Sequence, residues 1–202
     1  MKTDNDQLLK GLVPLIILCT LCGLLLTQTN RCTRERIEAN RQQLALRVIH
    51  EVLPVDSDND LFNDVIEIRD QTYFSDTVHV YRARYQGAPV GIVFMPVIGK
   101  GYKGRIELAV GVSREGVITG VRVIRHQETE GQGDRIDQRK SGWILGFDGR
   151  SLANTPAGDW AVAGDGGNFD QLSGATISPR GVINAVKKTL DFYAVNQDRL
   201  YK

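Results

Sequence analysis

The sequence predicts an α+β protein in which one domain, with an antiparallel sheet and packed helices, follows a transmembrane anchor. Three observations lead to this prediction: an apolar run near the N-terminus, a central region with alternating periodicity and hairpin turns, and a closing segment with helical periodicity. A length of 202 residues, 42% of them apolar, supports one domain rather than two. The expected limits are a tail (1–10), an anchor (11–30), a stalk helix with a linker (31–60) and the domain (61–202).

The anchor is the apolar run Gly11–Asn30, 20 residues without a formal charge. At a helical rise of ~1.5 Å per residue, it spans roughly the 30 Å of a membrane's hydrocarbon core. The run ends in Thr27–Asn30, which lacks the small residues of a signal-peptide cleavage site, so we expect an uncleaved helix. Pro14 is expected in the first turn of this helix, where no backbone hydrogen bond is lost.

The segment after the anchor predicts a stalk. It is highly charged, but Ile37, Leu44, Val48 and Val52 repeat with the spacing of one helical face. Pro54 is expected to end the helix, because a proline disfavours helical backbone in the residue before it. An acidic linker then leads into the domain.

Charges on either side of the anchor bear on the orientation of the domain. Two lysines, Lys2 and Lys10, precede the apolar run, and four arginines follow it. Cytoplasmic flanks of membrane helices are rich in Lys and Arg, so this bias alone favours a cytoplasmic domain. In a stalk helix the same arginines alternate with glutamates and would serve solvation and pairing instead. The four arginines are Arg31, Arg34, Arg36 and Arg41.

Four runs of β-forming residues make up the central region, after the period changes to two at Val65. Gln86–Pro89 and Arg114–Gly116 are hairpin signals between these runs. Consecutive strands joined by tight turns pair antiparallel, which gives the expected sheet. The later segment Asp134–Phe147 is expected to be helical or irregular. The four runs are Val78–Tyr85, Val90–Ile98, Arg105–Val112 and Val117–Arg125.

The closing segment predicts a helix that packs on the sheet. Ser178 is the expected N-cap, and Pro179 would then occupy the favoured first helical position. Apolar residues recur on one broad face, which identifies the side that the sheet should cover. This face consists of Val182, Ile183, Val186, Leu190 and Tyr193.

The residues in front of this helix carry the candidate chemistry. The start of a helix presents unpaired N–H groups and the positive end of its dipole, so it stabilises an anion near Thr176 without a lysine. Gly174 and Ala175 leave room for a large ligand, and the threonine hydroxyl can form a phosphoester. Taken alone, the tetrapeptide Ser-Gly-Ala-Thr also fits a plain polar turn into a helix.

A longer pattern distinguishes these two interpretations. Asp170–Thr176 resembles the flavinylation motif of FMN-binding domains, in which an aspartate precedes Ser/Thr-Gly-Ala-Thr and the last threonine carries the flavin. Gly101–Ile106 before a hairpin, and His126–Thr129 before a glycine-bearing loop, agree with that domain in order and spacing. With the anchor included, nearly the whole chain is similar to the family of G subunits of the Rnf ion-translocating electron transport complex. The C subunit of the sodium-pumping NADH:quinone reductase represents the next nearest family.

The resemblance implies a function and a maturation step. FMN would be bonded through its phosphate to Thr176 by a separate flavin transferase that uses FAD as donor. The chain would transfer electrons in a multi-subunit oxidoreductase of the bacterial inner membrane, with its domain in the periplasm, while polytopic partner subunits translocate the ions. A permanently tethered carrier cannot lose its cofactor by dissociation. The candidate cofactor-binding residues are Thr176, Ser173, Gly174, Ala175, Leu172, Asp170, Glu128 and Thr129.

Apolar contacts with the flavin ring are harder to assign. Leu172, four residues before the linkage, is the expected contact. Trp143 and Trp160 could stack on a flavin, but packing in the core or on the surface is the favoured role for both.

One loop departs from the family pattern His-x-Glu-Thr-Pro-Gly-Leu-Gly. Glu130 stands in place of the proline and Gln132 in place of the leucine, which leaves the rigidity and the apolar contact of the loop open. Glu128 and Thr129 keep the expected positions near the flavin. His126 and Glu128 also fit a polar pair at the surface end of a strand.

Composition and motifs argue against nucleic-acid binding, metal or haem sites in the domain, and NADH binding. The net charge of +1 gives no field that attracts nucleic acid. The domain has no cysteine, and the three histidines lack metal-ligand spacing, so we expect neither a disulfide nor a metal or haem site in it. No Gly-x-Gly-x-x-Gly or Walker-type loop is present, so NADH binding is not expected and electrons must come from another subunit.

Three other functions remain open. A membrane-tethered assembly module with this fold would need no cofactor, although an intact Thr176 speaks against it. A free-standing flavin reductase would need acid and base groups in a deep pocket, and the sequence shows no such group of residues. A component of a quinone reductase would use the same domain.

Overall fold

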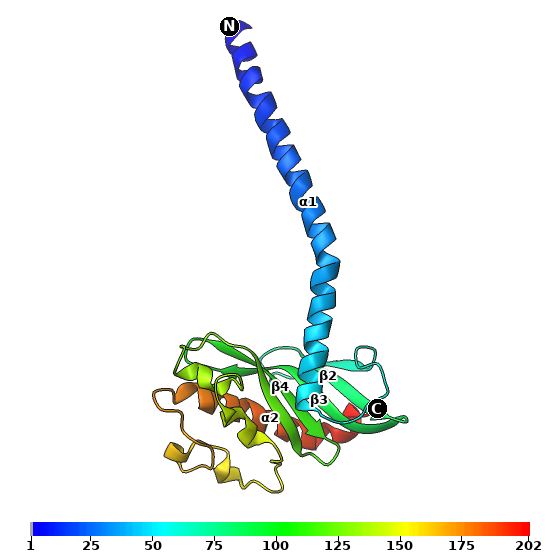
Figure 1. Cartoon of the computed structure of the whole chain (residues 1–202), viewed down its shortest axis with the longest axis vertical. Helices are drawn as coiled ribbons and strands as arrows, with labels where there is room; N and C mark the ends of the chain where they lie inside the picture. The colour runs from blue at the N-terminus through cyan, green and yellow to red at the C-terminus, as the bar shows by residue number, and fades with distance from the viewer. Residues whose placement is uncertain (1) are drawn as a thin grey trace. The chain divides into compact units, whose positions relative to one another are not determined.

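The computed structural model describes residues 2–202 and consists of two compact units, which divide between Leu46 and Arg47 and are described separately. Figure 1 shows its elements along the chain. The segment expected to be helical or irregular, Asp134–Phe147, contains two short 3-10 helices. The elements are α1 (Lys2–Val52), β1 (Val65–Ile68), β2 (Val78–Tyr85), β3 (Ala88–Lys100), β4 (Arg105–Ser113), β5 (Ile118–Arg125), η1 (Gly133–Ile136), η2 (Gly142–Phe147), η3 (Ala157–Asp159), η4 (Ala163–Asp165) and α2 (Ile177–Leu200).

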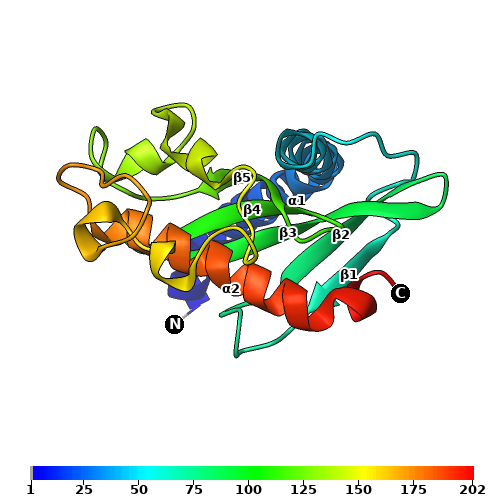
Figure 2. The same ribbon diagram turned by 90° about the horizontal axis from the view of Figure 1, so that it is seen from below.

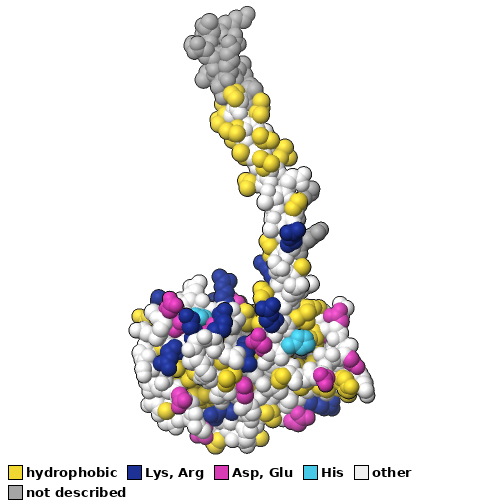
Figure 3. Space-filling model, in the orientation of Figure 1, with side chains coloured by type: hydrophobic (Ala, Val, Ile, Leu, Met, Phe, Trp, Pro, Cys, Tyr) yellow, Lys and Arg dark blue, Asp and Glu magenta, His cyan; other side chains and the backbone are white. Residues whose placement is uncertain are grey.

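Helix α1 contains the apolar run and, among the described residues, is the helix long and apolar enough to cross a membrane. The described side chains in this run are exposed, Leu26 to 72%, and Figure 3 shows an apolar band along the helix. Such a surface suits a lipid environment. Because residues before the run are also helical, α1 begins at Lys2 and Pro14 lies inside it, so the prediction that Pro14 falls in the first turn is wrong.

The last turn of α1 belongs to the same unit as the sheet. Val52 is fully buried there, and its carbonyl oxygen accepts a hydrogen bond of 2.5 Å from Thr119 Oγ1. Ile37 and Leu44 of the predicted stripe belong to the first unit and are exposed, whereas Val52 at the end of the stripe is buried. The limits expected for the tail, anchor, stalk and domain stay predictions.

The five strands form one antiparallel sheet in the order β1-β2-β3-β4-β5, which confirms the α+β class. The four predicted strands agree with β2–β5 to within two residues at each end. Gln86 and Gly87 join β2 to β3 with φ values of 51° and 78°. Two successive positive φ angles give the hairpin turn whose twist matches that of the flanking strands.

Helix α2 crosses one face of the sheet (Figure 2), and its predicted apolar face is buried in the main core. Phe192 of α2 packs edge to face on Phe94 of β3, with ring centroids 6.2 Å apart. The backbones meet where β3 ends: a Cβ at Gly181 would lie only 2.0 Å from the Lys100 carbonyl oxygen. Glycine at this position therefore fixes how closely α2 approaches the strand.

The start of α2 differs from the prediction. The helix begins at Ile177 and Thr176 is its N-cap, so the prediction that Ser178 caps the helix is wrong. Ser178 is buried, and its hydroxyl donates a hydrogen bond to the carboxylate of Glu128. This partner lies 50 positions earlier in the chain, so the sequence around Ser178 does not reveal it. Pro179 consequently takes the third helical position rather than the first.

Candidate functional site

A cavity of about 370 Å³ lies at the N-terminus of α2. Three segments that are far apart in the sequence bound it: the turn between β3 and β4, the loop after β5, and the residues in front of α2. Its volume falls within the ~300–1,000 Å³ of ordinary ligand pockets. The cavity brings together five of the predicted site residues: Glu128, Thr129, Gly174, Ala175 and Thr176.

Thr176 occupies the position that suits a bound phosphate. It caps the 24-residue helix α2, and its hydroxyl makes no hydrogen bond within the described chain. The N–H groups of Ile177 and Ser178 have no partner inside the helix and lie at the positive end of its dipole. A free hydroxyl beside such donors fits a phosphoester, since the helix start stabilises the phosphate charge.

Glu128 holds two walls of the cavity together. Its carboxylate accepts hydrogen bonds from the backbone N–H groups of Tyr102, at 3.3 Å, and Lys103, at 3.0 Å, and from the Ser178 hydroxyl. The side chain is buried, so the interpretation of Glu128 as part of a surface pair is wrong. A buried carboxylate is tolerated only when it is hydrogen-bonded, and these three donors supply that condition. Glu128 thereby ties the β3–β4 turn to α2.

Glu128→Gln is expected to destabilise the domain by about 1–3 kcal/mol. The amide keeps the size of the side chain but replaces one acceptor oxygen by a donor, which would face a backbone N–H or the Ser178 hydroxyl. Urea unfolding followed by tryptophan fluorescence measures the change. Glu130→Gln is the control, because the Glu130 side chain is 88% exposed and should alter stability little. Equal midpoints for both variants would contradict this role of Glu128.

The other predicted residues do not line the cavity. Asp170 is exposed, and its carbonyl oxygen accepts a hydrogen bond of 2.7 Å from Trp143 Nε1. Leu172 lies in the core, whereas Ser173 is exposed. Trp143 and Trp160 both pack in the core, as favoured. A direct role of Asp170, Leu172 or Ser173 toward the flavin stays a prediction.

Five further residues complete the cavity, and sequence reasoning did not place them there. Tyr102 lies in the Gly101–Ile106 motif and Gly133 is the last glycine of the loop pattern, but neither had a predicted role, and Ser178 was predicted to cap the helix. All five lie close in sequence to residues of the motifs. This closeness is the only sequence signal of their place, and it does not show that they line the cavity. The five are Tyr102, Gln132, Gly133, Ile177 and Ser178.

Backbone hydrogen bonds hold the loop that departs from the family pattern, although Glu130 stands where the pattern has a proline. The N–H groups of Gln132 and Asp134 both donate to the Thr129 carbonyl oxygen, at 3.2 and 3.3 Å. Glu130 points outward and pairs with Lys140 at 3.2 Å. Gln132 lines the cavity, so this chain presents an amide where the family pattern has an apolar side chain.

A charged cluster stabilises the chain just beyond this loop. Asp137 is buried, and it accepts hydrogen bonds from the backbone N–H and the guanidinium of Arg139. The Arg139 hydrogen bond holds the pKa of Asp137 below its usual value, although burial acts in the opposite direction. The ionised form is therefore the one that the fold favours.

Asp137→Asn is expected to lower stability at neutral pH and to have less effect in acid. The folded-state pKa lies below the unfolded value of about 4, so the stabilisation is present above that value and is lost as the pH falls through the folded pKa. Arg139 is 81% exposed, so the loss at pH 7 should stay under about 1 kcal/mol. Urea midpoints between pH 7 and pH 3 test this, and a difference that grows in acid would contradict it.

Comparison with known proteins gives consistent matches. The family model described as the FMN-binding domain matches residues 101–191. The G subunit of an ion-translocating oxidoreductase complex from Pseudoalteromonas atlantica is 45% identical over 84% of this chain and 80% of its own length. Proteins of the same name from Vibrio cholerae and Shewanella loihica are 39% and 40% identical, covering 95% and 89% of this chain and 92% and 86% of their own lengths.

Proposed function

This chain belongs to the family of G subunits of ion-translocating oxidoreductase complexes, and from that premise we propose that it carries FMN bonded covalently through its phosphate to Thr176. Membership makes it an FMN-binding electron-transfer subunit of a membrane oxidoreductase complex, together with other subunits. Its candidate membrane helix accords with this location. The covalent bond, its maturation, the translocase activity and the orientation are the parts that we propose.

The free hydroxyl of Thr176 in the cavity at the start of α2 is the observation that carries the proposal. A separate flavin transferase would join this oxygen to the riboflavin-bearing phosphorus of FAD, with AMP as the leaving group and loss of the hydroxyl proton. FMN, when bound, supplies the uptake and release of electrons. The helix start stabilises the phosphate charge, and Glu128 keeps the neighbouring turn in place.

With FMN bonded to it, the chain would contribute electron transfer to the complex and leave ion translocation to other subunits. Electrons arrive from one partner subunit and leave to another, because this chain has no recognisable site for NADH. One apolar helix without an internal charge gives ions no path, so polytopic partner subunits would perform the translocation. The chain therefore serves as the fixed electron relay of a translocase.

We further propose that the domain lies in the periplasm. This orientation is the one that the family resemblance implies. The four arginines that follow the anchor favour the opposite orientation by charge bias, but in a stalk helix they would serve solvation and pairing. A reporter enzyme that works only outside the cytoplasm, fused after Lys202, should be active. Activity of a cytoplasm-specific reporter at the same position would contradict this orientation.

The covalent bond is tested on chain purified from cells that make the flavin transferase and from cells that lack it. Only the first preparation should show flavin fluorescence in a denaturing gel and an added mass of FMN less water. An unmodified chain in both preparations would contradict covalent attachment and favour reversible binding of FMN or a cofactor-free assembly module.

A further inference from the structure

A larger groove, of about 990 Å³, lies beside the cavity at Thr176. Its walls come from the loop before β2, the end of β3, the turn into β4, and the side of α2 that carries Gly181, Asn184 and Lys188. Tyr102 lines both the groove and the smaller cavity, so the two open next to each other. Anything seated in the groove would lie close to a cofactor held at Thr176.

The rim of this groove is basic. Lys100 and Lys188 line it and are exposed, and Lys103 stands at the tip of the turn. Within the described part of the chain, none of these three ammonium groups has a carboxylate partner within 4.0 Å. Arg105, on the same rim, is instead paired with Asp76. We call Lys100, Tyr102, Lys103 and Lys188 the basic rim.

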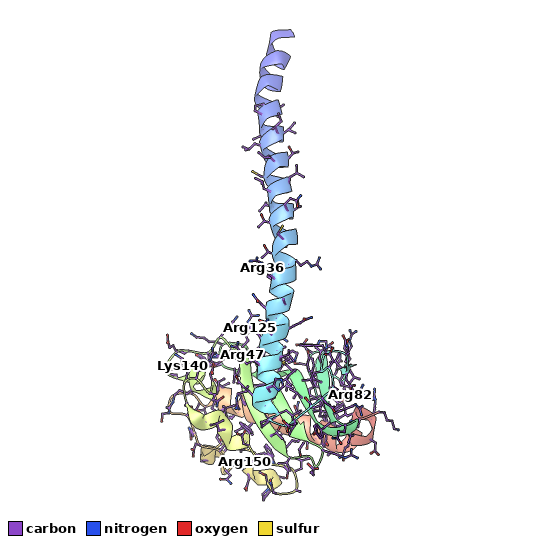
Figure 4. All side chains as sticks on the ribbon, turned by 45° about the vertical axis from the view of Figure 1, so that its right-hand side comes forward. Arg36, Arg47, Arg82, Arg125, Lys140 and Arg150 are labelled. Atoms are coloured by element: carbon purple, nitrogen blue, oxygen red, sulfur yellow. The ribbon has the colours of Figure 1, made fainter. Side chains whose placement is uncertain are left out.

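Lack of a carboxylate partner does not by itself distinguish these lysines, because within the described chain Lys187 and Lys202 also have none within 4.0 Å. Among the residues labelled in Figure 4, Arg82 pairs with a carboxylate, Lys140 pairs with Glu130, and Arg150 stacks over the Phe169 ring at 4.3 Å, whereas Arg125 has no carboxylate partner within 4.0 Å in the described chain. The chain as a whole carries a net charge of only +1. What distinguishes the basic rim is its place, because its unpaired lysines lie beside the groove that opens next to the cavity at Thr176.

Tyr102 adds an apolar contact to this charge. Its side chain is 71% exposed, although tyrosine normally buries much of its ring. Exposed aromatic side chains with neighbouring charges are typical anchors of protein interfaces, because they supply contact area at little entropic cost. The basic rim thus combines long-range attraction with a contact residue.

We propose that the basic rim docks an acidic face of the subunit that exchanges electrons with this chain. This inference rests on the proposed function, since a flavin tethered at Thr176 cannot diffuse and its partner must approach it. Electrostatic complementarity steers such encounters and orients them. Docking at the groove would bring the partner's redox group to the side of the domain where Thr176 lies.

Charge reversal in the assembled complex tests the proposal. Lys100→Glu/Lys188→Glu should slow the NADH-driven redox change of the covalent flavin by roughly tenfold at low ionic strength, and rising KCl should narrow the difference. Arg199→Glu/Lys202→Glu, an equal change in charge at the other end of α2, should keep the wild-type rate. Equal rates for both double variants would overturn the proposal.

Cross-linking of the purified wild-type complex with a zero-length carbodiimide provides the second measurement. Lys100, Lys103 or Lys188 should be joined to Asp or Glu residues of another subunit, and absence of these cross-links would overturn the proposal. Covalent flavin is measured in every sample. If the double variant lost it, the rim would serve the flavin transferase, which also overturns this inference; if the wild-type chain lacked it, the proposed function itself would fail.

Discussion

Thr176→Ala is expected to remove all covalent flavin from this chain and to abolish electron transfer through it. Alanine lacks the only oxygen that the proposed phosphoester could use at the N-cap of α2. The fold should persist, because the Thr176 hydroxyl makes no hydrogen bond within the described chain. Gel fluorescence should therefore vanish while the unfolding midpoint of the domain changes little, and NADH-driven electron flow should fall to that of membranes without the chain.

Ser173→Ala is the matched control for this experiment. Ser173 belongs to the same motif and carries a hydroxyl, but it is exposed and lies outside the cavity. This variant should keep its covalent flavin. Flavin that survives in Thr176→Ala, or disappears in Ser173→Ala, would show that the attachment residue has been assigned wrongly.

Gly181→Ala is expected to cause the largest loss of stability among single methyl additions in α2. The new Cβ would lie 2.0 Å from the carbonyl oxygen and 3.1 Å from the nitrogen of Lys100, so the helix must move away from β3. Overpacking of this kind costs about 1–3 kcal/mol and sometimes more, which exceeds the gain of about 1 kcal/mol in helix propensity. Because β3 leads directly into the turn at Tyr102, flavin loading should fall as well.

Gly158→Ala is the matched control for Gly181→Ala. A Cβ at Gly158 meets nothing within 4 Å, so its effect on stability should stay within about 0.5 kcal/mol. Thermal unfolding of both full-length variants in detergent, followed by the fluorescence of the buried tryptophans, compares them. Similar midpoints for the two variants would mean that α2 can shift on β3 without cost.

Local patterns predicted the elements of this fold well. Four of the five strands were predicted, because alternation and turn residues such as Gln86 and Gly87 act within a few positions of the chain, whereas β1 was not predicted as a strand. The apolar face of α2 was found for the same reason, since its burial follows from helical spacing. The tight turns predicted antiparallel pairing of consecutive strands, and the structure has this pairing from β2 to β5.

The site could be predicted only in part, because its walls meet through tertiary contacts. Thr176 was identified from its motif and its place before a helix. The start of α2 was misplaced because Ser178 fits the N-cap pattern, whereas its hydroxyl is bound by Glu128, 50 positions earlier in the chain. The contact of Glu128 with the turn at Tyr102 likewise depends on how β3, β4 and β5 pair. Neither contact has a periodic signal in the sequence.

The most direct test of the central claim is to locate the flavin on the wild-type chain by peptide mass spectrometry. Trypsin should release Ser151–Arg180 as one peptide, which contains Thr176 together with the hydroxyls of Ser151, Thr155, Ser173 and Ser178. This peptide should carry the added mass of FMN less water, and its fragment ions should place the addition on Thr176. An unmodified peptide, or an addition on one of the other hydroxyls, would contradict it.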